Sequence, residues 1–215
     1  MMKQTYCEEH KEYDFSELSE DAKQKAREHH TSDGYPYDDW WDGVYDDANR
    51  VAKILGLDIE LTRQTKSGGT VAVVNISFSG FWRQGDGASF EGSYRYNPQA
   101  IAEMNEYCND DELIRIATEL TVMQTTQRLK SLDFFAATIR QSGRYSHSYT
   151  MDFEIHDYGI DEIGEPDKTQ FAQLMRDFAD WIYKTLETEH DYLMSDKVVD
   201  EQLADEKFDE DGDVI

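Results

Sequence analysis

The sequence predicts an α+β fold in which an antiparallel sheet of about five strands is packed by helices, because two kinds of periodicity alternate along it. Apolar side chains recur at steps of three and four residues, as on one face of a helix, in the segments 37–55, 109–129 and 168–190, and start signals predict two more helices over 16–30 and 99–107. Strand-like segments bounded by turn residues lie between them, at 57–63, 70–82, 89–96, 133–141 and 145–156. We expect residues 1–194 to form a single domain with residues 1–15 frayed. Residues 195–215 should form an acidic C-terminal segment that ends in a solvated tail.

The expected helices have recognisable ends. Ser16 and Ser19 each offer an N-cap for the first helix, and the Glu, Lys and Gln residues that follow are good helix formers. Gly56 is a plausible C-terminal stop for the second helix. The pair Asn97-Pro98 combines an N-cap residue with a proline suited to the first helical position, so it predicts the start of the third.

The expected strands follow one another as hairpins. Gly68-Gly69 and Ser142-Gly143 read as hairpin connections. The last strand, 145–156, alternates over its whole length between aromatic or aliphatic and polar side chains. Such alternation predicts a sheet with one buried face and one face in water, as antiparallel sheets permit.

The charge balance excludes several classes of partner. The 215 residues contain 21 Lys and Arg against 46 Asp and Glu, which gives a net charge of −25. This charge repels the phosphates of nucleic acids and anionic membrane surfaces, so we expect neither direct nucleic-acid binding nor membrane association. It also steers the protein toward a basic partner surface. The alternative is that the acidity serves only solubility.

The cysteines and the apolar runs indicate the compartment. Cys7 and Cys108 lie far apart with no CxxC motif, so we expect two free thiols and a reducing cytoplasm. No apolar run approaches the roughly 18 residues of a membrane span. The first residues lack the apolar core of a secretory signal.

No catalytic, cofactor or metal motif can be assembled from the sequence. The histidines lack zinc-site spacing, and the many carboxylate pairs are uninformative among so many acids. The tail repeats Asp209, Asp211 and Asp213, but its glycine is misplaced for a calcium loop. We therefore predict a protein that is not an enzyme, with no catalytic residues, cofactor or metal. A small carboxylate–metal enzyme acting on nucleotides or nucleic acid is the alternative.

Two surfaces are candidates for partner binding. Asp38, Asp42 and Asp46 follow at four-residue steps, about 6 Å of rise each, along the edge of the expected 37–55 helix. Asp39 and Asp47 lie beside them, and this line of charge resembles a row of phosphates in sign and roughly in pitch. The alternative is the solvated face of a core helix.

The second candidate is the glycine-rich stretch 79–92. It carries Trp82 and Arg83 among five glycines, and it lacks the spacing of a phosphate-binding loop. It is either a recognition loop or a hairpin whose turn and bulge require glycine.

Three stretches resemble a group of small acidic proteins that bacteriophages and prophages encode: 13–23 (YDFSELSEDAK), 40–48 (WWDGVYDDA) and 78–92 (FSGFWRQGDGASFEG). The resemblance covers roughly the first 95 residues, and the glycine-rich stretch is its most specific part. It implies a phage setting in the cytoplasm of a bacterial host, where small acidic proteins often inhibit nucleic-acid enzymes or defence systems. No catalytic residues are carried over from this group.

The leading hypothesis is a phage-encoded acidic binding protein that inhibits a host nucleic-acid-handling or defence protein, with nucleic-acid mimicry as one mechanism. Its partner would be a host protein with a basic surface. Besides the carboxylate enzyme, an acidic homo-oligomeric accessory protein is an open alternative.

Overall fold

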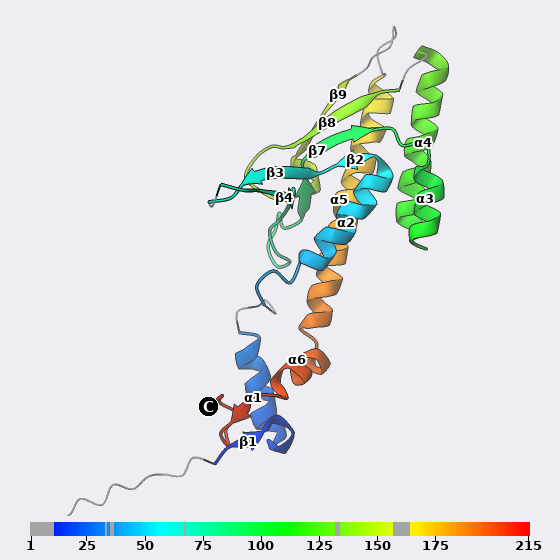
Figure 1. Ribbon diagram of the computed structural model, residues 1–215. Coiled ribbons are helices and arrows are strands. Elements are labelled where there is room, and N and C mark those ends of the chain that lie inside the picture. The colour runs from blue at the N-terminus through cyan, green and yellow to red at the C-terminus, as the bar shows by residue number, and fades with distance from the viewer. Residues whose placement is uncertain (1–10, 33, 35–36, 67, 132–133, 157–163) are drawn as a thin grey trace, which may run out of the picture. The chain divides into compact units, whose positions relative to one another are not determined.

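The computed structural model describes residues 11–32, 34, 37–66, 68–131, 134–156 and 164–215 (Figure 1). Helices and antiparallel sheets both contribute to it, which confirms the α+β class. Its residues group into two compact units, one made of Met1–Trp40 with Thr188–Ile215 and one of Trp41–Glu187. Helix α5 (Glu165–Leu193) contributes residues to both units.

The second unit contains the antiparallel strands that the sequence predicts. Each of the first three expected strands is divided into two short strands in succession, whereas the last two are continuous. Their bounds are β2 Leu57–Asp58, β3 Glu60–Gln64, β4 Thr70–Val74, β5 Ile76–Phe78, β6 Ala88–Phe90, β7 Gly92–Arg95, β8 Ala136–Gln141 and β9 Met151–His156. One sheet has the order β2-β7-β8-β9, and β3 pairs with β4 and β5 with β6.

The divided strands change partners at a common junction. The backbone N–H of Asn75 donates to the carbonyl oxygen of Ile59 at 2.8 Å, and the N–H of Glu91 donates to the carbonyl oxygen of Asn75 at 3.1 Å. Gly92 follows this junction, and a Cβ atom there would lie 2.2 Å from the carbonyl oxygen of Asp58. Glycine is required because the two backbones approach so closely.

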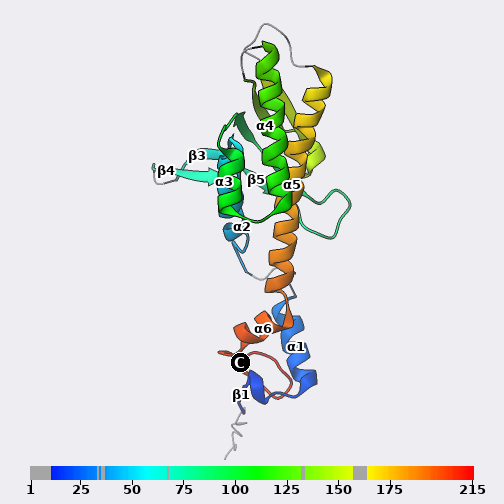
Figure 2. The same cartoon turned by 90° about the vertical axis from the view of Figure 1, so that its right-hand side faces the viewer.

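The helices of this unit lie on one side of the sheet (Figures 1 and 2). They are α2 (Asp42–Leu55), α3 (Ala100–Tyr107), α4 (Asp111–Ser131) and the larger part of α5. Tyr94, Ala137 and Ile139 are buried on the sheet face that meets them. The ring of Phe171 in α5 lies 5.1 Å from that of Tyr94 and 5.4 Å from that of Phe135, between centroids. The core of this unit therefore lies between sheet and helices.

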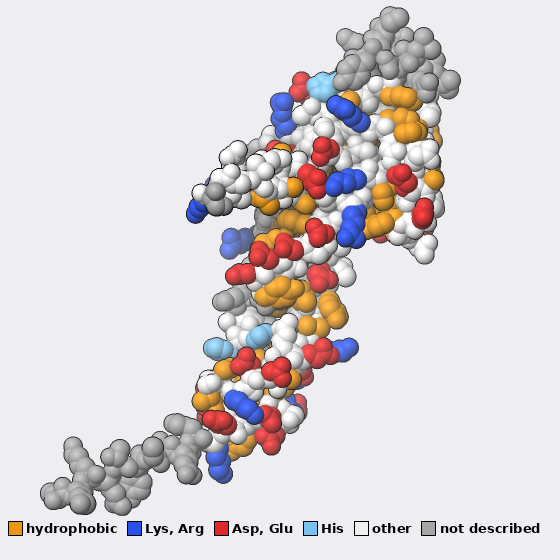
Figure 3. Space-filling model, viewed as in Figure 1, with side chains coloured by type: hydrophobic (Ala, Val, Ile, Leu, Met, Phe, Trp, Pro, Cys, Tyr) orange, Lys and Arg blue, Asp and Glu red, His pale blue; other side chains and the backbone are white. Residues whose placement is uncertain are grey.

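The other face of the sheet is open to solvent, as alternation along the strands predicts. Acidic and basic side chains are interspersed on the side of the molecule turned to the viewer in Figure 3. On β8 and β9, exposed Arg140 lies 3.6 Å from the carboxylate of Glu154. This face therefore carries charges of both signs, despite the net charge of the chain.

The first unit is built from both ends of the described chain. It contains β1 (Tyr13–Asp14), the 3-10 helix η1 (Phe15–Glu17), α1 (Glu20–His30), the end of α5, α6 (Asp196–Leu203) and β10 (Lys207–Phe208). Ser19 caps α1, since its hydroxyl accepts a hydrogen bond from the N–H of Ala22 at 3.2 Å. The side chains that form its core are Phe15, Leu18, Ala22, Ala26, Val199, Leu203 and Phe208.

The C-terminal acids Glu210, Asp211 and Asp213 are exposed as expected, but the segment before them is docked at Phe208. Strand β10 pairs antiparallel with β1, and Phe208 is fully buried with its ring 5.8 Å from that of Phe15. The ammonium group of Lys25 lies 2.9 Å from the carboxylate of Asp213. Residues 195–215 therefore belong with the N-terminal residues, and Phe15 is buried where a frayed segment was expected.

Two element boundaries also differ from expectation. The helix expected over 37–55 begins at Asp42, because Asp39 has φ 62°, a left-handed conformation that no α-helix contains. The strand expected over 145–156 begins at Met151. Before it, the hydroxyl of Thr150 donates to the carbonyl oxygen of His147 at 2.7 Å and holds a 3-10 helix, η2 (Ser148–Thr150). Such local side-chain bonds compete with strand pairing.

Candidate functional site

The structure breaks up the row of aspartates that the sequence predicts. Asp42 and Asp46 are exposed on α2, but Asp38 and Asp39 precede the helix and belong to the first unit. The next four-residue step after Asp46 is the exposed Arg50, whose charge is of the opposite sign. The row therefore has two carboxylates on one helix.

Asp47 is engaged within the second unit. Its carboxylate accepts a hydrogen bond from the hydroxyl of Tyr107 at the end of α3, and this bond raises the pKa of Tyr107. Asp47 therefore helps to hold α3 against α2, and its oxygens are less available to a partner than those of Asp42 and Asp46.

Trp82 and Arg83 lie in the loop of residues 79–87, which connects β5 to β6. One carboxylate oxygen of Asp86 accepts the backbone N–H of Trp82 at 2.9 Å and that of Arg83 at 2.7 Å. The N–H of Asp86 in turn donates to the carbonyl oxygen of Arg83 at 3.0 Å. These bonds fix the backbone of the loop tip, while the side chain of Trp82 is 64% exposed.

The base of this loop is anchored on α5. The ring of Phe81 lies 5.6 Å from that of Tyr183 and 4.9 Å from that of Phe78, between centroids. Burial, followed by the charges of Glu187 and Asp86, raises the pKa of Tyr183. Contacts among Phe78, Phe81 and Tyr183 thus attach the base of the loop to α5.

A second loop, residues 142–150, lies against the first. The hydroxyl of Ser79 donates to the carbonyl oxygen of Ser146 at 3.3 Å. A Cβ atom on Gly85 would lie 3.8 Å from the ring of Tyr145, which is ordinary van der Waals contact. Tyr145 and Tyr149 of this loop are 57% and 69% exposed.

We call the exposed aromatic and arginine side chains of these loops the two-loop surface: Trp82, Arg83, Arg144, Tyr145 and Tyr149. Trp, Tyr and Arg are the residues enriched where protein interfaces gain most of their affinity. The sequence indicated the first two, but it assigned Tyr145 and Tyr149 to a strand and gave no role to Arg144. The hydroxyl residues Ser142, Ser146, Ser148 and Thr150 were a signal for a loop, since their side chains can bond to the local backbone and compete with strand pairing.

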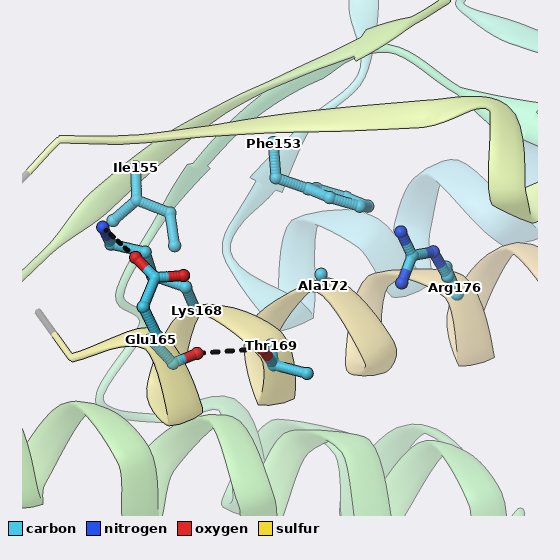
Figure 4. Close-up of a pocket in the computed structure, with 7 residues that line it drawn as sticks. All are labelled: Phe153, Ile155, Glu165, Lys168, Thr169, Ala172 and Arg176. Atoms are coloured by element: carbon cyan, nitrogen blue, oxygen red, sulfur yellow. Dashed lines mark hydrogen bonds and ion pairs between the residues drawn. The ribbon is translucent and has the colours of Figure 1, made fainter.

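A pocket of about 410 Å³ lies between β9 and α5 (Figure 4). Phe153 and Ile155 of β9 form its apolar wall. Side chains of α5 form the rest: Glu165, Lys168, Thr169, Ala172 and Arg176. No motif in the sequence predicted this pocket.

One family model matches this chain, over residues 40–196. Its description is "Domain of unknown function (DUF8835)". This chain belongs to that family. No curated protein and no solved structure matches the chain.

The DUF8835 match contains both loops of the two-loop surface and the pocket. All the side chains that form the core of the first unit lie outside it. The candidate sites are therefore features of the DUF8835 region, whereas the packed core at the two ends of the chain is outside that region.

Two further observations bear on function. Among the described residues, no three His, Cys, Asp or Glu side chains gather closely enough to hold a metal ion. Within the same residues, no helix has both the length and the apolar character that crossing a membrane requires. Cys108 is a free thiol, and Cys7 lies outside the described residues.

Proposed function

We propose that this protein acts by binding another protein and that the two-loop surface makes the contact. The observation that carries the proposal is Trp82, a large aromatic side chain exposed on a loop whose backbone is already fixed by Asp86. A fixed loop loses little conformational entropy when it binds. More of the free energy gained by burying the apolar ring therefore appears as affinity. Tyr145 adds a second aromatic group on the adjoining loop.

The net charge of −25 favours a partner with a basic surface. A charge of this size acts over several ångströms of solvent and accelerates encounter with a basic protein, mostly through the association rate. Exposed carboxylates such as those of Asp42 and Asp46 contribute to this steering without being part of the contact.

A protein that handles nucleic acid is the partner class that we propose, because such proteins carry basic grooves. The resemblance of residues 78–92 to phage-encoded acidic proteins supports a host defence or nucleic-acid enzyme as target and inhibition as the outcome. Mimicry of nucleic acid by α2 is not part of this proposal, since Arg50 interrupts its row of carboxylates.

The test compares wild-type protein with the double variant Trp82→Ala/Tyr145→Ala as bait in bacterial lysate, with quantitative mass spectrometry. Truncating residues at the centre of an interface typically costs 2 kcal/mol or more, about a 30-fold loss of affinity. Tyr192→Ala is the matched control, because Tyr192 is similarly exposed but lies in the first unit.

A partner that mediates the function is captured by wild type and by the control but strongly depleted with the double variant. Circular dichroism checks that all three proteins are folded. If every captured protein binds the double variant as well as it binds wild type, the two-loop surface is not the contact. Sedimentation of the purified proteins shows whether the captured partner is a second copy of this chain.

A further inference from the structure

The pocket between β9 and α5 has a defined chemical arrangement, and its Arg176 contacts one residue of the two-loop surface, Tyr149. Its helical residues recur at steps of three and four from Glu165 to Arg176, so they form one stripe of α5. Phe153 and Ile155 are alternate residues of β9 and therefore face the same way. Its volume of about 410 Å³ is within the range of small-ligand sites.

Arg176 is the unusual member of this stripe. Its guanidinium carbon lies 5.1 Å from the ring centroid of Tyr149 and 5.4 Å from that of Phe153, so two aromatic rings hold it by cation–π contacts. Its Nε atom is buried and has no hydrogen-bond partner. Figure 4 shows the two terminal nitrogens of the guanidinium pointing into the pocket, toward Ala172.

The absence of a carboxylate partner is notable in so acidic a chain. Among the described residues, no Asp or Glu forms an ion pair with Arg176. The neighbouring residue Asp177 pairs instead with Arg115, which also binds Glu112 and Glu119. Buried polar groups usually have a hydrogen-bond partner, and the buried Nε–H group of Arg176 has none.

Lys168 adds positive charge at the other end of the stripe. Its ammonium lies 3.0 Å from the carboxylate of Glu165, and the two side chains are 41% and 85% exposed. An ion pair this exposed is weak. Between the two cations, the pocket is lined by the apolar side chains of Phe153, Ile155 and Ala172.

We propose that this pocket binds a small organic carboxylate. The carboxylate accepts hydrogen bonds from the two terminal N–H groups of Arg176, whose planar fork matches a carboxylate in a bidentate pair. The apolar body of the ligand lies between Ile155 and Ala172, and Phe153 covers it. The aromatic contacts of Arg176 preorganise the site, because the guanidinium is already oriented before the ligand arrives.

The experiment follows the methyl NMR signals of Ile155 and Ala172 while matched probes are added to the full-length protein. The pairs are benzoate with benzamide and hexanoate with hexanamide, which differ in charge but hardly in shape. We expect both carboxylates to give saturable shifts and both amides to bind at least about tenfold more weakly, since hydrogen bonds to a charged group are the stronger kind. Inorganic phosphate has negative charge but no apolar body, so it should bind more weakly than benzoate if the apolar part of the ligand contributes to binding.

Variants locate the charge that is responsible. Arg176→Gln should weaken benzoate at least about tenfold, and Arg176→Lys should weaken it too, because it keeps the charge but loses the fork. Arg140→Gln is the matched control, since Arg140 is exposed on the open face of the same sheet, and it should change nothing. The wild-type comparison of acids with amides decides the question even if the Arg176 variants fail to fold. Absence of saturable shifts up to about 10 mM, or equal binding of acid and amide, overturns the proposal.

Discussion

Phe208 is the side chain whose removal best tests the docked C-terminus. It is fully buried against Phe15 and is part of the core of the first unit, together with residues of α1 and α6. Replacing a buried Phe by Ala typically costs about 3–5 kcal/mol, of which part is transfer free energy and part is the cavity that is left. A unit with so small a core has little stability in reserve, so Phe208→Ala should leave it largely open.

Hydrogen exchange measured by mass spectrometry reports this opening segment by segment. The expected cost corresponds to a loss of protection of about a hundredfold to several thousandfold in Glu20–His30 and Asp196–Leu203. Peptides from α4 and β8 should keep their wild-type exchange, because they belong to the other unit. Val214→Ala is the control, since Val214 is half exposed and its truncation should cost no more than about 0.5 kcal/mol. Wild-type protection of α1 in Phe208→Ala would refute the reasoning.

Two further predictions follow from specific contacts. A hydrogen bond from Arg27 holds the pKa of Asp200 below its usual range, so the contribution of this pair to stability is full above about pH 4 and is lost as the pH falls through the folded-state value. Exchange in α1 should therefore rise on acidification less steeply in Asp200→Asn than in wild type, and an identical pH dependence would contradict the assignment. Gly92→Ala should lower the free energy of unfolding in urea by about 1–3 kcal/mol or more, because its Cβ would meet the carbonyl of Asp58. Gly43→Ala, on α2 with open space around it, should raise that free energy by up to about 1 kcal/mol; equal effects of the two substitutions would be evidence against the close approach at Gly92.

Periodicity predicted most elements of the fold because burial on one face is what both helices and strands require. The stripe of α5 that includes Phe171 and Phe178 is buried as its spacing indicates. The start of α2 was predicted too early because the hydrophobic pattern continues back to Tyr37. The left-handed backbone of Asp39 prevents a helix there, and the pattern carries no sign of it. The docked tail was missed because one aromatic residue, Phe208, lies within a run of acids, and charge dominates any average over such a run.

The candidate sites were less predictable than the elements. Trp82 and Arg83 stood out because glycines surround them, but Tyr145 and Tyr149 alternate with polar residues as a strand would. Local hydrogen bonds of Thr150 override that alternation, and they depend on the folded loop. The pocket could not be predicted from the sequence, because it forms only where one face of α5 packs against alternate residues of β9.

The pairing of β1 with β10 has a consequence for biosynthesis. A ribosome makes α1 before the second unit, whereas Val199, Leu203 and Phe208, which cover the buried alanines of α1, are made after it. Every residue of the second unit is synthesised before those last partners emerge, so that unit can fold first. The first unit can therefore complete its core only after synthesis has passed Phe208. A nascent chain that stops before Val199 leaves the apolar side of α1 uncovered, which exposes it to chaperones and proteases.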